Sequence, residues 1–397
     1  TEKAGVAGLQ PKAGKQWSIS AGWFDYDNDG KLDLLVVNYV KVPKVEPVCK
    51  SNEIRSYCAP DSFEGTRNIL YHNNGDGTFT DVSEKSRIGT QTGKGMGVAF
   101  ADYDGDGYAD VFVSNDTFRN FLFHNNRNGT FSEVGILQGV AYNDDGKSIA
   151  AMGADFRDID NDGHPDIFVT GMRGDTFPLF RNADGGFSDI TNNSGVARAT
   201  APYTAWGAGI FDFDNDGDKD LFTADSSILD NSEAVDHLPS KLNNQVLRNL
   251  GNSRFVDVSH DAGESFSEPR ANRGAAFGDL NNDGRIDVVV TAHQELPQIL
   301  MNRSANSNHW ILLNLVGTKS NRDAIGAKAK LTASDGRVQY NHVTTSVGLG
   351  GSSDKRVHFG IGGASMIRKL EIVWPSGTWQ VLHDVRPDQV LTIREQG

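Results

Sequence analysis

The chain has 397 residues, a formal net charge of −14, 44 glycines and a hydrophobic fraction of 38%. It contains no apolar run long enough to span a membrane, and its acidic balance argues against nucleic acid as a partner. Length alone predicts two or three domains, but the glycine content and short apolar segments favour many short β-strands joined by turns.

An irregular segment at residues 42–65 contains the two cysteines, Cys49 and Cys58, with eight residues between them. A small disulfide loop is sterically easy here and would stabilise the fold by ~2–3 kcal/mol, although two free thiols are the alternative. Because disulfides persist in oxidising compartments, we expect a secreted protein, either periplasmic or extracellular.

An acidic nine-residue turn, Asp-x-Asp/Asn-x-Asp-Gly-x-x-Asp, occurs five times along the chain. Its first aspartates are separated by 77, 56, 54 and 67 residues, and residues 42–65 and 226–243 enlarge the first and fourth units. A recurring unit of this length indicates a propeller or another repeat array.

Each unit has the same order of predicted strands. A Gly/Ala-rich strand (97–101, 152–156, 207–211, 274–278) leads into the acidic turn. A β-branched strand (110–114, 287–291), a third strand ending in Asn (69–73, 121–125, 178–182, 245–249) and a fourth strand (78–82, 130–134, 186–190, 254–258) follow. Four antiparallel strands make one propeller blade, whereas parallel β-helices use much shorter coils. We therefore predict an all-β propeller over residues 1–305, with its Gly/Ala strands innermost.

The residues before the first unit suggest where in a blade the chain opens. Residues 1–6 are similar to residues 83–88, which follow a fourth strand. We therefore expect the chain to open just past such a strand.

The acidic turn has the chemistry of a calcium loop. Calcium takes six to eight hard oxygen ligands, which carboxylates at positions 1, 3, 5 and 9 and the carbonyl of position 7 can supply, while Gly at position 6 allows the reversal. The predicted ligands are Asp25, Asp27, Asp29, Lys31 and Asp33; Asp102, Asp104, Asp106, Tyr108 and Asp110; Asp158, Asp160, Asp162, His164 and Asp166; Asp212, Asp214, Asp216, Asp218 and Asp220; and Asp279, Asn281, Asp283, Arg285 and Asp287.

Other interpretations of the turn explain less. An EF-hand requires Glu at position 12, where this chain has Val or Thr within a strand, and Mg²⁺ prefers fewer protein oxygens. Asp-Gly turns alone also favour hairpins, but clustered carboxylates repel one another without a cation. We expect about five Ca²⁺ ions in a structural role.

The repeat stops after Asn302, and residues 306–397 form a different β-rich segment with about seven predicted strands. The segment contains residues 320–327 (SNRDAIGA), 356–362 (RVHFGIG) and 373–377 (VWPSG). No nucleophile elbow, phosphate loop or dinucleotide fingerprint occurs. His72 and His124 share one repeat position, and we expect them to be structural. We predict no catalytic or organic-cofactor residues, and enzymatic activity stays an open question that leans towards none.

These motifs resemble a known family. The repeats are similar to FG-GAP/VCBS propeller repeats, related to those of integrin α-subunit heads, and the C-terminal motifs resemble the ASPIC/UnbV domain. The combination resembles the cartilage acidic protein family, in its bacterial form. The resemblance implies calcium ligands at the positions above. It also implies about seven blades, against five detectable units. A fragment, a shorter natural form, a ring completed by C-terminal strands, and five blades beside a separate β-domain are all open.

Two classes of function follow. The favoured one is a calcium-binding extracellular module for protein–protein recognition or adhesion, because propellers present a broad face of loops. Its partner would be another extracellular protein or a glycan. The alternative is an enzyme, or a small-ligand or glycan binder, that uses the central propeller pocket.

Overall fold

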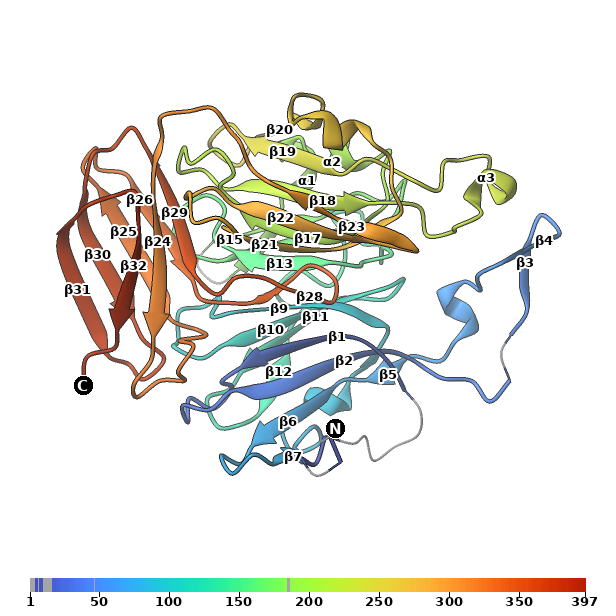
Figure 1. Cartoon of the computed structure of the whole chain (residues 1–397). Helices are drawn as coiled ribbons and strands as arrows, with labels where there is room; N and C mark the ends of the chain where they lie inside the picture. Colours follow the sequence, from blue (N-terminus) through green and yellow to red (C-terminus); the bar gives the residue numbers. More distant parts are fainter. Residues whose placement is uncertain (1–3, 6, 10–15, 46, 184–185) are drawn as a thin grey trace.

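The computed structural model describes residues 4–5, 7–9, 16–45, 47–183 and 186–397, and the fold is all-β (Figure 1). The expected opening just past a strand concerns residues 1–6, which lie largely outside the described residues. Helices are confined to single turns: α1 (Thr191–Ser194), α2 (Val196–Thr200), α3 (Ser232–Val235), η1 (Pro60–Ser62), η2 (Ile88–Thr90), η3 (Ser259–Asp261) and η4 (Glu264–Ser267). Among the described residues, none of the helices has the length and hydropathy needed to cross a bilayer.

Five antiparallel sheets correspond to the five repeat units and are arranged as propeller blades. They are β1 (Gln16–Phe24), β2 (Asp33–Lys41), β6 (Ile69–Asn73), β7 (Phe79–Asp81); β9 (Gly95–Ala101), β10 (Asp110–Asn115), β11 (Phe121–Asn125), β12 (Phe131–Glu133); β13 (Ala154–Arg157), β14 (Asp166–Val169), β15 (Leu179–Ala183), β16 (Gly186–Asp189); β17 (Ala205–Phe211), β18 (Asp220–Asp225), β19 (Gln245–Asn249), β20 (Phe255–Asp257); and β21 (Asn272–Gly278), β22 (Asp287–Ala292), β23 (Glu295–Leu300). The predicted fold class is confirmed. The fifth blade has three strands instead of the expected four, because the chain leaves it for the C-terminal sheets.

The Gly/Ala strands are innermost, as predicted. β1, β9, β13, β17 and β21 pack against one another in chain order. A Cβ on Gly153 would lie 2.2 Å from the Trp206 carbonyl oxygen, and one on Gly97 would lie 2.6 Å from that of Met152. Glycine is therefore required where the backbone of the next blade approaches this closely. Four hydrophobic clusters, which include side chains of these strands, fill the spaces between successive blades.

The C-terminal strands form a separate two-sheet sandwich, so they do not supply additional blades. One sheet contains β29 (Val357–Gly362), β24 (His309–Val316) and β32 (Gln389–Arg394). The other contains β26 (Val338–His342), β25 (Lys328–Ala333), β30 (Ile367–Val373) and β31 (Trp379–Val385). The sheets enclose one core that includes the buried Trp374. These are the seven predicted strands, while β27 (Ser346–Val347) and β28 (Gly351–Ser352) form an unpredicted hairpin. The domain boundary at residue 305 stays a prediction.

The β27–β28 hairpin projects from the sandwich into the middle of the blades (Figure 1). The Gly348 N–H donates to the Ala154 carbonyl at 2.8 Å, and the Gly350 N–H donates to Ser20 Oγ at 3.0 Å. β27 also packs on β9 and β17, and β28 packs on β21. The hairpin thus touches the innermost strand of every blade and lies where these strands converge.

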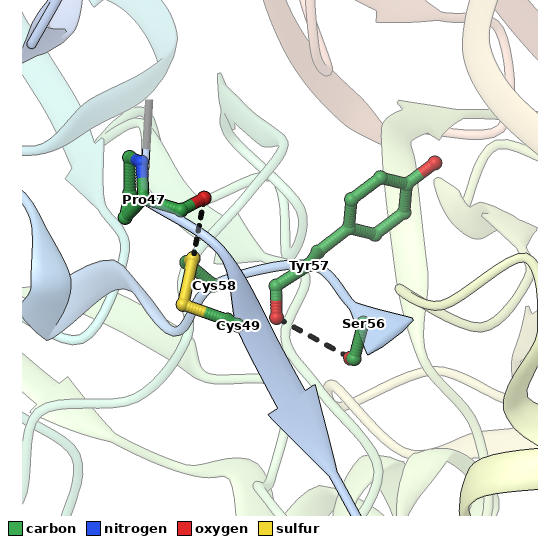
Figure 2. Close-up of a disulfide and its surroundings, with 5 residues drawn as sticks. All are labelled: Pro47, Cys49, Ser56, Tyr57 and Cys58. Carbon is green, nitrogen blue, oxygen red and sulfur yellow. Dashed lines mark hydrogen bonds between the residues drawn. A yellow bond between two sulfur atoms is a disulfide. The ribbon is translucent and has the colours of Figure 1, made fainter. Parts of the chain in front are cut away.

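The two enlarged units meet at the other end of the blades, away from the sandwich (Figure 1). The first insertion contains β3 (Cys49–Ser51) and β4 (Ile54–Ser56), and β5 (Thr66–Arg67) pairs with β8 (Thr92–Gly93) beside it. Figure 2 shows the predicted Cys49–Cys58 disulfide, which the structure confirms. Tyr57 Oη donates to Asp230 Oδ2 at 3.1 Å in the fourth-blade insertion. Residues from these two insertions therefore form an arch.

Candidate metal centres

The five acidic turns are named loops 1 to 5 (residues 25–33, 102–110, 158–166, 212–220 and 279–287), with positions numbered 1 to 9. Each loop joins the first and second strands of its blade. In loop 1 the Asp25 carboxylate accepts the N–H groups of Asp29 and Gly30 at 3.1 and 2.9 Å. The same bond from the position 6 glycine to the position 1 aspartate occurs in all five loops. Position 1 therefore shapes the turn as well as facing its centre.

The position 9 aspartate ties each loop to the third strand of its blade. In loop 2 the buried Asp110 accepts the Tyr103 N–H at 3.2 Å and the Asn125 N–H at 2.8 Å. Equivalent pairs of bonds recur in the other four loops. The loop geometry thus follows from a local pattern of side-chain to backbone bonds that every repeat contains.

Carboxylate oxygens converge inside the loops. Ligand atoms of Asp25, Asp27 and Asp29 lie within 4.8 Å of one another, as do those of Asp102, Asp104 and Asp106 and those of Asp158, Asp160 and Asp166. Asp27 Oδ1 and Asp160 Oδ1 are buried without a hydrogen-bond partner among the described residues. Hard oxygen donors with unsatisfied lone pairs fit a calcium ion. The predicted carbonyl ligands at position 7 and the number of ions stay predictions.

The raised pKa values of the loop carboxylates also indicate that these sites favour a bound cation. Burial raises the pKa of Asp25 to about 7 and that of Asp212 to about 8. In both loops the neighbouring carboxylates raise it further, Asp27 and Asp29 acting on Asp25 and Asp216 and Asp214 on Asp212. Without a cation, these carboxylates hold protons near neutral pH because burial disfavours the charged form and the neighbouring like charges add to that effect.

One position of the third strand carries histidine in some blades and arginine in others, and its side chain lies against the loop carboxylates. Sequence analysis gave the histidines at this position only a structural role. His72 Nδ1 lies 3.2 Å from Asp33 and 3.5 Å from Asp27, and His124 Nδ1 lies 3.3 Å from both Asp104 and Asp110. The equivalent residue in the third blade is Arg181. The available signal in the sequence was that a histidine or an arginine recurs directly before the strand-end asparagine.

Two basic side chains from outside loop 3 lie against it. Arg181 Nε lies 2.5 Å from Asp160 Oδ2, and its Nη2 lies 3.2 Å from Asp162 Oδ2. The buried Lys219 donates to Asn161 Oδ1 at 3.1 Å, and its charge acts on Asp158. Loop 3 is therefore partly neutralised by the protein itself.

The strand-end asparagines link neighbouring blades, a role that sequence analysis missed. The Asn125 side-chain amide donates to the Tyr26 carbonyl of the preceding blade at 2.8 Å. Asn182, Asn249 and Asn302 make the same connection to the second, third and fourth blades. Each bond ends on the carbonyl of loop position 2, so it couples one acidic loop to the next blade.

We expect Asn125→Ala to lower the free energy of unfolding by about 2–3 kcal/mol, because it leaves buried carbonyls unsatisfied. Asn73→Ala is the matched control, since the Asn73 amide bonds within its own blade, to the Leu32 carbonyl at 2.9 Å, and should cost about 1 kcal/mol. Urea unfolding in calcium measures both. Equal losses would contradict the inter-blade role.

The C-terminal sandwich covers the loop face. Every loop touches it. The Lys319 carbonyl approaches Gly30 of loop 1, Lys328 bonds Asp102 of loop 2, and Tyr340 lies over Gly163 of loop 3. The Gly362 N–H bonds the Asn215 carbonyl of loop 4, and His358 Nε2 lies 3.1 Å from the Gly284 carbonyl of loop 5. Burial lowers the pKa of His358 to about 4, so a neutral imidazole donates this bond. The acidic loops are thus part of the contact between the two groups of sheets.

Comparisons with known proteins match both parts of the chain. A family model described as FG-GAP-like repeat matches residues 57–113, 110–169, 158–223 and 236–290, which is more than half of the chain. A second model, described as ASPIC and UnbV, matches residues 317–397. The matched ranges include loops 2 to 5 in full, so the repeats found from the acidic turns correspond to the family repeats.

Among individual proteins, cartilage acidic protein 1 of Mus musculus is 24% identical over 324 residues, which cover 80% of this chain and 46% of the relative. The Homo sapiens protein is 23% identical over 324 residues, which cover 80% and 45%. The chain spans about half the length of these curated relatives.

A solved structure of an Agrocybe aegerita lectin, described as recognising non-reducing terminal N-acetylglucosamine, is 16% identical. The match covers 74% of this chain and 75% of that one, with a TM-score of 0.39, and a likeness at that score supports no argument. The identification depends instead on the repeat match over more than half of the chain. The chain belongs to the FG-GAP-like repeat family and carries a C-terminal ASPIC and UnbV domain.

Proposed function

We propose that this chain is a calcium-stabilised extracellular recognition module. The observation that carries the proposal is the convergence of carboxylates in the acidic loops, some with buried oxygens that have no partner in the described part of the chain. The Cys49–Cys58 disulfide supports an oxidising, extracellular location. Calcium would be held by the carboxylates at positions 1, 3, 5 and 9, with Asn281 replacing one of them.

The contribution of an ion would be structural. Each loop connects two strands of a blade, the position 2 carbonyls of loops 1 to 4 accept a bond from the next blade, and the outer surfaces of the loops contact the C-terminal sandwich. An ion that removes the repulsion inside a loop would therefore stabilise three contacts at once. The proposal also includes adhesion or protein binding, which requires an exposed surface that the sandwich does not cover.

That face is the one opposite the metal loops. The loop face is covered by the sandwich, and the hairpin lies against the innermost strands, which argues against the alternative of a central-pocket enzyme or ligand binder. At the other end the arch leaves Val45 and Val48 82% and 73% exposed. Exposed apolar side chains suit a protein partner.

Isothermal titration of ion-free protein with calcium tests the proposal. We expect saturable binding of several equivalents with a dissociation constant below the millimolar calcium of extracellular fluid. Asp104→Asn combined with Asp106→Asn should remove about one equivalent, and Asp144→Asn, an exposed acid outside the loops, should remove none. No saturable binding would overturn the calcium assignment.

We expect Arg181→Ala to strengthen calcium binding at loop 3. The guanidinium bridges two of its carboxylates, and a partly exposed ion pair of this kind is worth about 0.5–1 kcal/mol, equivalent to a several-fold change in affinity. Arg248→Ala is the control at the same repeat position, because the charge of Arg248 acts on Asp214 of loop 4 without bridging two carboxylates. An unchanged calcium isotherm for Arg181→Ala would contradict competition at this loop.

A further inference from the structure

A cleft lies between the metal loops and the C-terminal sandwich, and no function described above uses it. It has a volume of about 300 Å³ and is lined by loops 1, 2 and 3 on one side and by β25, β26, β30 and β31 on the other. Pockets for small molecules begin at about this size. Its walls come from both parts of the chain, so the cleft exists only when the sandwich is seated.

The sandwich contributes an ordered face of alternating strand residues. Strand pairing places His342, Lys328, Val373 and Trp379 in one cross-strand row, and Tyr340, Lys330 and Glu371 in the next. Side chains two residues apart on a strand share a face, so both rows face the loops. Their register is set by sheet hydrogen bonds, which makes the face rigid.

Two aromatic rings are prominent on this face. Trp379 is 63% exposed although it lies on a well-paired strand. The Tyr340 ring lies over Gly163 of loop 3, and Lys330 Nζ is 5.3 Å from its centroid. Tyr108 and Pro165 line the opposite wall. Aromatic rings at a cleft provide flat apolar surfaces for a ligand that also has polar edges.

Basic and acidic side chains of the sandwich also line the cleft. Lys330 provides a donor, and Glu371, which accepts Lys369 Nζ at 2.8 Å, provides an acceptor. A wholly apolar ligand would bury these charges without partners. A strongly anionic ligand would meet Glu371 and the carboxylates of Asp25, Asp102 and Asp158, which also line the cleft. The ligand that fits has apolar faces and many groups that both donate and accept hydrogen bonds.

We propose that this cleft binds a short saccharide. A pyranose ring presents a face of C–H groups that packs on an aromatic ring, and its hydroxyl edge matches the paired lysine and glutamate. The inference goes beyond the proposed function, because the cleft lies on the loop side of the blades and the proposed protein-binding face is the arch at the other end. Trp379 and Tyr340 would pack against sugar rings, and Lys330 and Glu371 would bind hydroxyl groups.

Isothermal titration of the full, calcium-loaded chain with the uncharged trisaccharides maltotriose, chitotriose and cellotriose tests the proposal. We expect at least one of the three to bind, and Trp379→Ala and Tyr340→Ala each to weaken that binding at least tenfold. Trp17→Ala is the matched control, because Trp17 is a 55% exposed tryptophan on β1 that does not line the cleft, and it should bind normally. Thermal melts establish that the variants are folded.

The saccharide assignment is overturned if none of the three sugars binds, or if binding survives both aromatic substitutions. It is also overturned if only the apolar probe 1-anilinonaphthalene-8-sulfonate binds in a Trp379-dependent way. A calcium titration on the same preparation separates the two proposals. Normal calcium binding without sugar binding refutes this inference alone, whereas absent calcium binding refutes the proposed function.

Discussion

Ion-free protein is expected to melt about 10 °C or more below the calcium-loaded protein. A loop at a hundredfold excess of calcium over its dissociation constant stabilises the folded state by about 2.7 kcal/mol, and several loops together reach the order of 10 kcal/mol, comparable to the whole stability of a domain. The loss should be cooperative, because each of loops 1 to 4 is linked to the next blade through a strand-end asparagine.

The stability of the ion-free protein should depend on pH, because the pKa values of carboxylates in the loops are raised. Burial, and nearby carboxylates after it, raise the pKa of Asp33 to about 8, and burial raises that of Asp110 to about 7. The folded state therefore holds protons that the unfolded state has released, so stability is greatest below the unfolded pKa near 4 and falls as pH rises towards 8. Calcium-loaded protein should lack this decline near neutral pH.

Differential scanning calorimetry of resin-stripped protein, with and without calcium, at pH 5 to 8 measures both effects. Magnesium at equal concentration is the control and should restore less of the melting temperature, because it prefers fewer protein oxygens. An identical melting temperature in stripped and calcium-loaded samples would refute the structural role of the ions.

Gly348→Val is expected to destabilise the protein by about 4 kcal/mol or more. Gly348 has φ +72°, and a Cβ there would lie 3.1 Å from both the Ala208 nitrogen and its carbonyl oxygen. A side chain would therefore combine left-handed backbone strain with overpacking at the convergence of the blades. The hairpin would have to withdraw, which would also unseat the sandwich from the metal loops.

Gly336→Val separates these two causes. Gly336 has φ +93° in the turn between β25 and β26, and a Cβ at this position would have no neighbouring atom within 4 Å among the described residues. The substitution should cost only the backbone strain, about 2 kcal/mol. Chemical denaturation in calcium compares the two variants. Equal losses would mean that the hairpin contact at Gly348 contributes little.

Sequence analysis correctly predicted the all-β fold, the five units, the innermost Gly/Ala strands and the disulfide. Two details differ, since the fifth blade has three strands and the C-terminal segment contains an extra hairpin. The hairpin strands have two residues each, too short to show an alternating pattern. The contacts of His72 with the loop carboxylates and the inter-blade role of the strand-end asparagines were missed because their partners lie in other strands or in another blade.

What the sequence determined by itself is the local chemistry of the repeats. All predicted ligands of a loop lie within nine residues, and a glycine at position 6 and alternating acids are enough to specify the turn, since short-range sterics and charge act without the rest of the fold. Only the tertiary structure decided that the sandwich covers the loop face, that its hairpin lies among the innermost strands, and that a cleft forms between loops and sheet. Most of these contacts join residues more than a hundred positions apart, as between Lys328 and Asp102. They depend on the complementary shapes of two packed surfaces, which leave no periodic signal along the chain.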